Sequence, residues 1–356
     1  MSRFFIKSLA ALQPYVPGEQ PQDMQYIKLN TNESPFPPAP GVMKVIGEAE
    51  VAKLYLYSDP DCKALIAAIA KRFGLRPEQV TVGNGSDEVL WFALRAFCDE
   101  TTPLAYSDIT YGCYKTWCSM LNVPSNVLPL REDFSVNTGL YRGLKCTVMI
   151  TNPNAPTGIC LPLSEIEAVL RANPDNVVIV DEAYVDFGGE SAVSFIDKYD
   201  NLLVVQTCSK SRSLAGARLG FAMGNPDLIA DLNRIKFSFN PYNVNRLSLI
   251  AGKAALEDKA YFEQCCKAIC DIRAWTVKAL EDRGFTVLPS YANFIFAKSG
   301  AVSGGDLYTK LRRRGILVRW FDSDRIRPFV RITIGSQTQM EALVAAVDEI
   351  MKEAKV

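Results

Sequence analysis

The segment Val204-Val205-Gln206-Thr207-Cys208-Ser209-Lys210 decides how the rest of this chain is interpreted. It is an apolar run typical of a buried strand, and it ends in a serine and a lysine. Arg218 follows within Ala215-Gly216-Ala217-Arg218-Leu219-Gly220. An amine, a hydroxyl and a guanidinium near one strand end can together hold an anionic ligand. We interpret Lys210 as the covalent anchor of a cofactor, and the alternative is a solvated lysine in a surface loop.

Two more predicted strands also end in polar residues. The β-branched run Val177-Val178-Ile179-Val180 is typical of a buried parallel strand and leads into Asp181-Glu182-Ala183-Tyr184. The apolar run Cys146-Thr147-Val148-Met149-Ile150 leads into Thr151-Asn152-Pro153-Asn154-Ala155-Pro156-Thr157-Gly158. Ligands of open α/β sheets bind at the carboxyl ends of the strands. Three polar strand ends in succession therefore favour a ligand site over an isolated surface lysine.

A glycine turn lies between a predicted strand and a predicted helix in Val80-Thr81-Val82-Gly83-Asn84-Gly85-Ser86-Asp87. Backbone amides at a helix N-terminus form a cradle for phosphate. Ser86 and Asp87 suit a helix cap equally well, so both interpretations stay open here. The stretch lacks the Gly-Lys-Ser/Thr ending of a P-loop and the glycine spacing of a dinucleotide-binding fingerprint.

In combination these motifs resemble the fold type I pyridoxal-phosphate (PLP) aminotransferases. The wording NPNAPTG, VDEAYVDF and TCSKSRSLAGARLGFA is most similar to the histidinol-phosphate aminotransferase family, and the resemblance runs from Pro14 to Gly335. It implies an α/β fold: a large domain whose mainly parallel, seven-stranded sheet is flanked by helices, plus a smaller α+β domain. We expect an N-terminal arm over residues 1–34, a large PLP-binding domain over 35–245, and a small C-terminal domain over 246–356 that packs with the arm.

The resemblance also implies how the cofactor is held. Lys210 is expected to bind PLP covalently and to act as the base, Asp181 to pair with the pyridine nitrogen, and Tyr184 to hydrogen-bond O3′. Tyr111 is expected to stack on the ring. The phosphate is expected to be held by Gly85, Ser86, Asp87, Ser209, Arg218 and, across a homodimer interface, Tyr57.

One position departs from the family pattern. Members usually carry asparagine before Pro-Thr-Gly, where it binds O3′, and this chain has Ala155. We expect Asn154 or Asn152 to substitute for it.

The resemblance places the substrate on four residues: Arg331 and Arg319 for its acidic groups, with Tyr15 and Tyr111 also in contact. It implies an enzyme of histidine biosynthesis that converts histidinol phosphate and 2-oxoglutarate into imidazole-acetol phosphate and glutamate. An aromatic amino acid aminotransferase and a threonine-phosphate decarboxylase-like enzyme are alternatives with the same machinery. A noncatalytic PLP-binding regulatory module is an alternative of a different class.

Composition narrows the possible partners. The chain has 356 residues, 48% of them hydrophobic, with 39 basic and 39 acidic side chains and no histidine. A net charge of zero gives no electrostatic reason to expect nucleic acid or an anionic membrane. The ten cysteines form no Cys-x-x-Cys pair, so we expect core thiols, no metal and a reducing cytoplasm. No run is long enough for a signal peptide or a membrane span, and the expected partners are small-molecule substrates.

Overall fold

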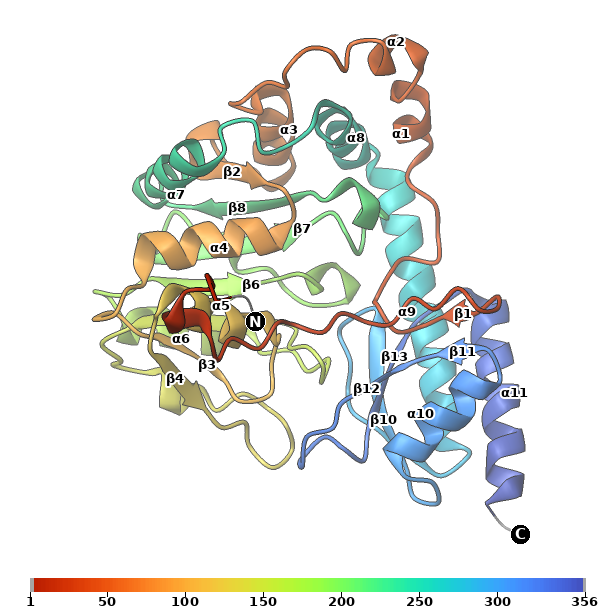
Figure 1. Ribbon diagram of the computed structural model, residues 1–356. Helices are drawn as coiled ribbons and strands as arrows, with labels where there is room; N and C mark the ends of the chain where they lie inside the picture. The colour runs from red at the N-terminus through yellow and green to blue at the C-terminus, as the bar shows by residue number, and fades with distance from the viewer. Residues whose placement is uncertain (1–2, 355–356) are drawn as a thin grey trace.

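The computed structural model describes residues 3–354, and its largest sheet has seven strands in the order β2-β8-β7-β6-β5-β3-β4 (Figure 1). The strands are β2 (Val80–Gly83), β3 (Leu104–Ser107), β4 (Ser125–Leu128), β5 (Thr147–Thr151), β6 (Val178–Asp181), β7 (Leu202–Thr207) and β8 (Gly220–Gly224). Strands β3 to β7 run parallel, whereas β8 is antiparallel to both β7 and β2. The predicted α/β fold with a mainly parallel, seven-stranded sheet is confirmed.

Helices flank this sheet, which explains its continuous apolar strands. They are α3 (Lys63–Phe73), α4 (Ser86–Phe97), α5 (Cys113–Leu121), α6 (Leu163–Ala172) and α7 (Pro226–Phe239). Successive side chains of β6 point to opposite faces, so Val178 and Val180 join one hydrophobic cluster while Ile179 joins another. All three are fully buried. A strand buried on both faces needs apolar residues at every position rather than at alternate ones.

A second, antiparallel sheet of four strands follows in the order β12-β13-β10-β9. Its strands are β9 (Phe285–Val287), β10 (Phe294–Ser299), β12 (Arg319–Trp320) and β13 (Val330–Thr333), and the helices of this half are α8 (Arg246–Glu257), α9 (Lys259–Glu281), α10 (Gly304–Arg313) and α11 (Gln337–Glu353). The sequence predicts a helical tract from Arg246 to Glu281 with an interruption near Asp258, and this is confirmed. Asp258 ends α8, and its side chain accepts a hydrogen bond from the Tyr261 amide to cap α9.

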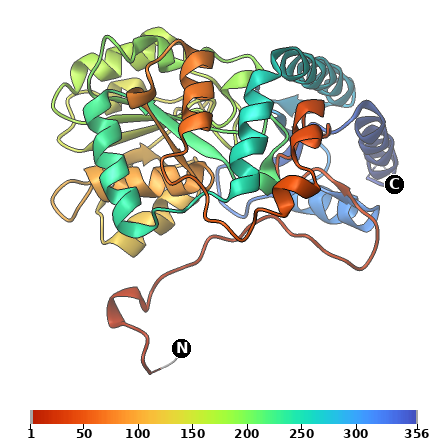
Figure 2. The same ribbon diagram turned by 90° about the horizontal axis from the view of Figure 1, so that it is seen from above.

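The N-terminal segment reaches the second half of the molecule before the large sheet begins. Strand β1 (Ile27–Lys28) pairs in parallel with β11 (Ile316–Leu317), nearly 290 residues further along the chain. Figure 2 shows the first residues extending away from the body and the chain then returning to it. Short helices α1 (Pro40–Val45) and α2 (Glu48–Val51) follow. The domain boundaries given above stay a prediction.

The remaining short elements are 3-10 turns: η1 (Lys7–Leu9), η2 (Pro77–Gln79), η3 (Thr138–Tyr141), η4 (Val185–Phe187), η5 (Ala192–Phe195) and η6 (Ala215–Ala217). Within residues 3–354, no helix combines the length and the apolar character that crossing a bilayer requires.

Candidate active site

A cavity of about 350 Å³ lies where β5, β6 and β7 end. Small-molecule sites typically start near this volume, and the carboxyl ends of parallel strands are where α/β folds place them. Eight of the predicted site residues line it, namely Ser86, Asp87, Tyr111, Asp181, Tyr184, Ser209, Lys210 and Arg218. The other lining residues are Thr31, Glu33, Thr151, Ala155, Ala183, Thr207, Ala215 and Gly216.

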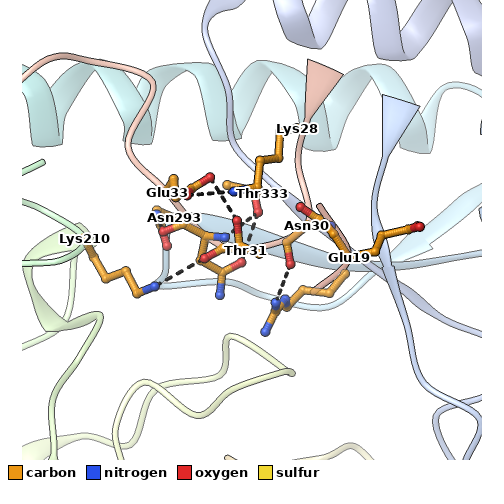
Figure 3. A network of polar contacts seen from close by, with 10 residues as sticks. Glu19, Lys28, Asn30, Thr31, Glu33, Lys210, Asn293 and Thr333 are labelled. Carbon is orange, nitrogen blue, oxygen red and sulfur yellow. Dashed lines mark hydrogen bonds and ion pairs between the residues drawn. The ribbon is translucent and has the colours of Figure 1, made fainter. Parts of the chain in front are cut away.

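Lys210 follows β7 and extends toward the arm. Its Nζ donates to the backbone oxygen of Thr31 at 3.3 Å, and Figure 3 shows the side chain pointing toward that residue. Burial, together with the positive charge of Arg331, lowers the pKa of Lys210 to about 8. Ser211 donates to Asp186 at 2.5 Å, which fixes the turn after the lysine. The structure therefore holds an amine that can lose its proton close to neutral pH.

Asp181 ends β6 and is almost completely buried, with 3% of its surface exposed. Burial raises the pKa of its carboxyl to about 6. Two donors act against that rise: the Tyr114 hydroxyl donates to Oδ2 at 2.5 Å, and the Ala183 amide donates to Oδ1 at 3.2 Å. A buried carboxylate without a cation is unfavourable, so this group suits a cationic partner supplied by a ligand.

Tyr184 connects the cavity to the arm. Its hydroxyl oxygen accepts a hydrogen bond from Asn32 Nδ2 at 3.0 Å, and Thr333 Oγ1 donates to Asn32 Oδ1 at 3.1 Å. Because Asn32 donates, the hydrogen of the Tyr184 hydroxyl stays available for another acceptor. Burial raises the pKa of Tyr184, which keeps that hydrogen in place.

The opposite end of the cavity carries a half-exposed ion pair. Arg218 Nη2 donates to Asp87 Oδ2 at 3.0 Å, and the Tyr111 hydroxyl donates to Asp87 Oδ1 at 3.0 Å. Gly85 has φ +92, and a Cβ there would lie 2.7 Å from Arg218 Nη2. A Cβ on Gly220 would lie 2.1 Å from the Ser86 amide nitrogen. The two glycines thus allow the start of α4 to lie against Arg218.

Of the two interpretations of Ser86 and Asp87, the structure favours the anion cradle. Gly85 is the N-cap residue of α4, no side chain caps the helix, and Asp87 pairs with Arg218 instead. The first amides of a helix lack intrahelical partners and attract anions. Together with Ser209 and Arg218 they form a donor set that fits a phosphate, while Lys210 and Asp181 fit an aldehyde and a ring nitrogen.

Arg331, Arg319 and Tyr15 lie beside the cavity without lining it. Arg331 and Arg319 are paired neighbours on β13 and β12. Arg331 Nη2 donates to Asn30 O at 2.9 Å, and among the described residues its buried Nε has no hydrogen-bond partner. Arg319 donates to the backbone oxygens of Val16 and Pro17, which anchors the arm. The Tyr15 ring lies 5.9 Å from that of Tyr111.

Three predicted residues lie elsewhere. Asn154 is buried, and its Nδ2 already donates to Ile109 O and Thr157 Oγ1, both at 3.0 Å. Asn152 is equally enclosed and exchanges hydrogen bonds with the backbone of Leu161. Neither asparagine lines the cavity, so this arrangement gives no support to a contact with O3′.

Tyr57 is 80% exposed and stacks on Tyr242, with ring centroids 4.5 Å apart.

Sequence reasoning missed several residues of the site. Thr31 and Glu33 line the cavity, and Glu33 accepts hydrogen bonds from Lys28 and Thr31 (Figure 3). The run Asn30-Thr31-Asn32-Glu33 in an otherwise proline-rich arm is the signal that could have indicated them. Tyr114 was missed because it lies on α5 behind the cavity, whereas Tyr111 precedes that helix and lines the cavity. Among residues 3–354, no group of three or more Cys, Asp or Glu side chains could hold a metal ion.

Comparison with known proteins agrees with this geometry. The family model for aminotransferase class I and II matches residues 24–347, so fold and site define an aminotransferase of that class. Histidinol-phosphate aminotransferase of Marinomonas sp. (strain MWYL1) is 50% identical over 349 residues, covering 97% of this chain and 99% of the relative. The enzyme of that name from Clostridium acetobutylicum is 47% identical, covering 98% and 99%. The chain belongs to the histidinol-phosphate aminotransferase family, as predicted.

Solved structures share the fold. Histidinol-phosphate aminotransferase from Sinorhizobium meliloti, in complex with pyridoxal-5′-phosphate, superposes with a TM-score of 0.90 at 24% identity and 99% coverage of both chains. L-threonine-O-3-phosphate decarboxylase from Porphyromonas gingivalis superposes with a TM-score of 0.79 at 23% identity, covering 92% of this chain and 99% of the decarboxylase. At these identities the likeness extends to the fold alone, which confirms the predicted fold type I architecture.

Proposed function

We propose that this chain is a PLP-dependent aminotransferase that transfers the amino group of histidinol phosphate to 2-oxoglutarate, yielding imidazole-acetol phosphate and glutamate. One observation carries the proposal: a single cavity contains an amine, a buried carboxylate and a guanidinium, from Lys210, Asp181 and Arg218. These groups complement the aldehyde, the ring nitrogen and the phosphate of PLP. The choice of histidinol phosphate is supported by relatives of that name at 47–50% identity over nearly the whole chain.

Bound PLP supplies the electron sink for a carbanion at the substrate Cα. The protein supplies charge and placement. The Asp181 carboxylate would pair with the ring nitrogen and favour its protonated form, and the Tyr184 hydroxyl would donate its free hydrogen to O3′. Ser86, Ser209, Arg218 and the amides after Gly85 would bind the phosphate, with Asp87 keeping Arg218 in place. Tyr111 would cover one face of the ring.

Lys210 moves the proton. Its neutral amine would take the proton from the substrate Cα and deliver it to the cofactor carbon C4′. A general base works best when its pKa lies near the working pH, and burial next to Arg331 brings the pKa of Lys210 to about 8. The chain contains no histidine that could take this role.

The substrate binds through the arginines next to the cavity. The buried Nε of Arg331 lacks a partner among the described residues, and a planar guanidinium suits a bidentate carboxylate or phosphate. Arg319 lies beside it on the neighbouring strand, so two anionic groups can be bound together. Tyr15, close to Tyr111, encloses the remaining part of the substrate.

We further propose a homodimer in which the partner's Tyr57 completes the phosphate site. Exposed apolar side chains cluster around this residue in the sequence, including Leu54, Tyr55 and Leu56. Exposed apolar patches of this kind mark interfaces. The ten free cysteines support a reducing, cytoplasmic location.

A single-turnover absorbance experiment tests the proposal. The PLP-loaded protein is mixed separately with histidinol phosphate, phenylalanine and threonine phosphate, and the spectral conversion of the bound cofactor is followed. We expect fast conversion with histidinol phosphate alone. Conversion mainly with phenylalanine would assign an aromatic aminotransferase, and carbon dioxide release from threonine phosphate would assign a decarboxylase. No change with any of the three would indicate a noncatalytic PLP-binding module.

A further inference from the structure

A chain of three hydroxyls lies behind Asp181, and those of Tyr114 and Thr151 belong to buried residues while Thr110 is partly exposed. The Tyr114 hydroxyl lies 2.5 Å from Asp181 Oδ2 and 2.9 Å from Thr151 Oγ1. Thr151 Oγ1 in turn lies 2.9 Å from Thr110 Oγ1. Tyr114 is fully buried, with none of its surface exposed. Thr151 and Asp181 line the cavity, so the buried Tyr114 hydroxyl connects to it through these two residues.

Counting hydrogens fixes the donor and the acceptor of each bond in the hydroxyl chain. An ionised carboxylate only accepts, so Tyr114 donates its single hydrogen to Asp181. Tyr114 must then accept from Thr151, and Thr151 must accept from Thr110. Hydrogen bonds aligned head to tail polarise one another, and all of them converge on the same carboxylate oxygen.

No basic side chain appears among the groups that set the charge of Asp181. Its hydrogen-bond donors are Tyr114 and the Ala183 amide, and the nearby charge that affects it is the negative one of Asp87. Burial and the charge of Asp181 hold the pKa of Tyr114 well above its usual range, so Tyr114 remains a donor at every working pH. The tyrosine hydroxyl is thus the principal side-chain group that favours the charged carboxylate.

We propose that Tyr114 is a positioning residue, whose hydroxyl holds the Asp181 carboxylate in one orientation and favours its ionised form. This inference rests on the role of Asp181 given under Proposed function. Tyr114 does not line the cavity, so it acts on the cofactor through Asp181 and not by contact. Hydrogen bonds to charged groups are the stronger ones, and losing this one leaves a buried charge under-satisfied.

The variant Tyr114→Phe removes only the hydroxyl, and Tyr106→Phe is the matched control. Tyr106 is also buried and packs against the Tyr114 ring, but its hydroxyl donates to Ser125 at 3.1 Å. We expect Tyr114→Phe to lower kcat about 10- to 100-fold while KM changes less than about threefold. Without the Tyr114 hydroxyl, Asp181 should hold a proton more readily, and the ring nitrogen should then carry less positive charge. The Lys210 nitrogen that binds the cofactor should therefore lose its proton less readily, and the pH midpoint of the visible absorbance of the PLP-loaded protein should rise. Tyr106→Phe should leave both quantities unchanged.

The role of Asp181 is tested in parallel with Asp181→Asn. If Asp181→Asn alters cofactor absorbance and PLP affinity while Tyr114→Phe behaves like Tyr106→Phe, the inference about Tyr114 is wrong and the proposed function stands. If Asp181→Asn itself alters neither, the proposed role of Asp181 fails, and that of Tyr114 with it. Adding Tyr114→Phe to Asp181→Asn should change little more, because contacting residues that act through one group are not additive.

Thermal unfolding by circular dichroism establishes that each variant is folded. If Tyr114→Phe does not fold, the test uses Thr110→Val instead. This variant removes the first donor of the hydroxyl chain and leaves Tyr114 and Asp181 intact. We expect it to raise the absorbance midpoint in the same direction by a smaller amount. An unchanged midpoint in that case would overturn the proposal.

Discussion

The two ends of the cavity each contain a carboxylate that accepts a hydrogen bond from a tyrosine, yet their surroundings differ. Asp181 accepts from Tyr114 and a backbone amide and is 3% exposed, whereas Asp87 accepts from Tyr111 and Arg218 with its side chain 44% exposed. The two carboxylates accept a similar number of hydrogen bonds, but they differ in their exposure to solvent. The Asp181 end is buried, and no basic side chain within residues 3–354 appears among the groups that shift the pKa of Asp181, whereas the Asp87 end is half-exposed and paired with Arg218.

This difference gives the two ends different tasks. A buried carboxylate without a cation is kept at the expense of stability, and it gains most when a ligand brings a positive charge. A half-exposed ion pair contributes little to folding and can rearrange when an anion arrives. We therefore expect the buried end around Asp181, called the dry end, to control the chemistry. We expect the half-exposed end around Asp87 and Arg218, called the wet end, to control cofactor retention.

Asp181→Asn should lower kcat/KM by about 1,000-fold, because the preorganised charge opposite the ring nitrogen is lost. Steady-state kinetics with saturating PLP measure this. Glu182→Gln is the matched control: Glu182 is the next residue and equally buried, but it bonds Ser191, Ala192 and Gln206 away from the cavity. Equal losses in the two variants would show that any buried acid here matters only for folding.

Arg218→Gln should weaken PLP binding about 100-fold, since one charge-assisted contact to the phosphate is removed. The free energy of unfolding of the cofactor-free protein should change by less than about 1 kcal/mol, as expected for an exposed ion pair. Equilibrium dialysis gives the affinity, and denaturant titration gives the stability. A large loss of stability with unchanged affinity would contradict the assignment of the wet end.

The cofactor-free protein should become more stable in Asp181→Asn, by about 3 kcal/mol at pH 8. The pKa of Asp181 is about 6 in the folded protein against an ordinary value of 3.8, so folding favours the protonated form. The free energy of unfolding of the protein with Asp181 falls as pH rises from about 4 through 6, because the buried carboxyl ionises. The variant cannot ionise at this position, so its free energy of unfolding does not fall in this way. Urea titrations at several pH values should therefore show an advantage that grows to about pH 6 and is absent below about pH 4.

The rate of proton transfer should rise about tenfold between pH 7 and pH 9, since the pKa of Lys210 is about 8 and its neutral form is the base. The charge of Asp87 raises the pKa of Lys210, so Asp87→Asn should move this rise to lower pH. Single-turnover rates across the pH range measure both effects. An unchanged pH profile in Asp87→Asn would contradict the influence of Asp87 on the pKa of Lys210.

The sequence predicts the dry end well because its geometry follows from local patterns. Apolar runs before Thr151, Asp181 and Ser209-Lys210 identify parallel strands, and parallel strands bring their carboxyl ends to one edge. The direction of β8 is different, because an apolar run from Gly220 to Gly224 does not encode whether a strand is parallel or antiparallel.

The sequence predicts an arm that packs with the small domain and brings Tyr15 to the substrate, but the pattern of strand ends does not identify the other arm residues of the site. Thr31, Asn32 and Glu33 reach the site because β1 pairs with β11, and nothing near residue 30 in the sequence indicates a partner at residue 316. The hydroxyl chain from Thr110 to Tyr114 likewise depends on contacts between α5 and β5, which only the folded structure brings together. Tyr57 depends on a second chain, which one sequence does not describe.

The most direct test of the account is to locate the lysine that holds the cofactor. The PLP-loaded protein is treated with borohydride, which makes the bond between lysine and cofactor permanent, and the digested peptides are mapped by mass spectrometry. We predict one labelled site, at Lys210, and no label in Lys210→Ala. A label on any other lysine, or equal labelling of the variant, would contradict the assignment of this cavity as the catalytic site.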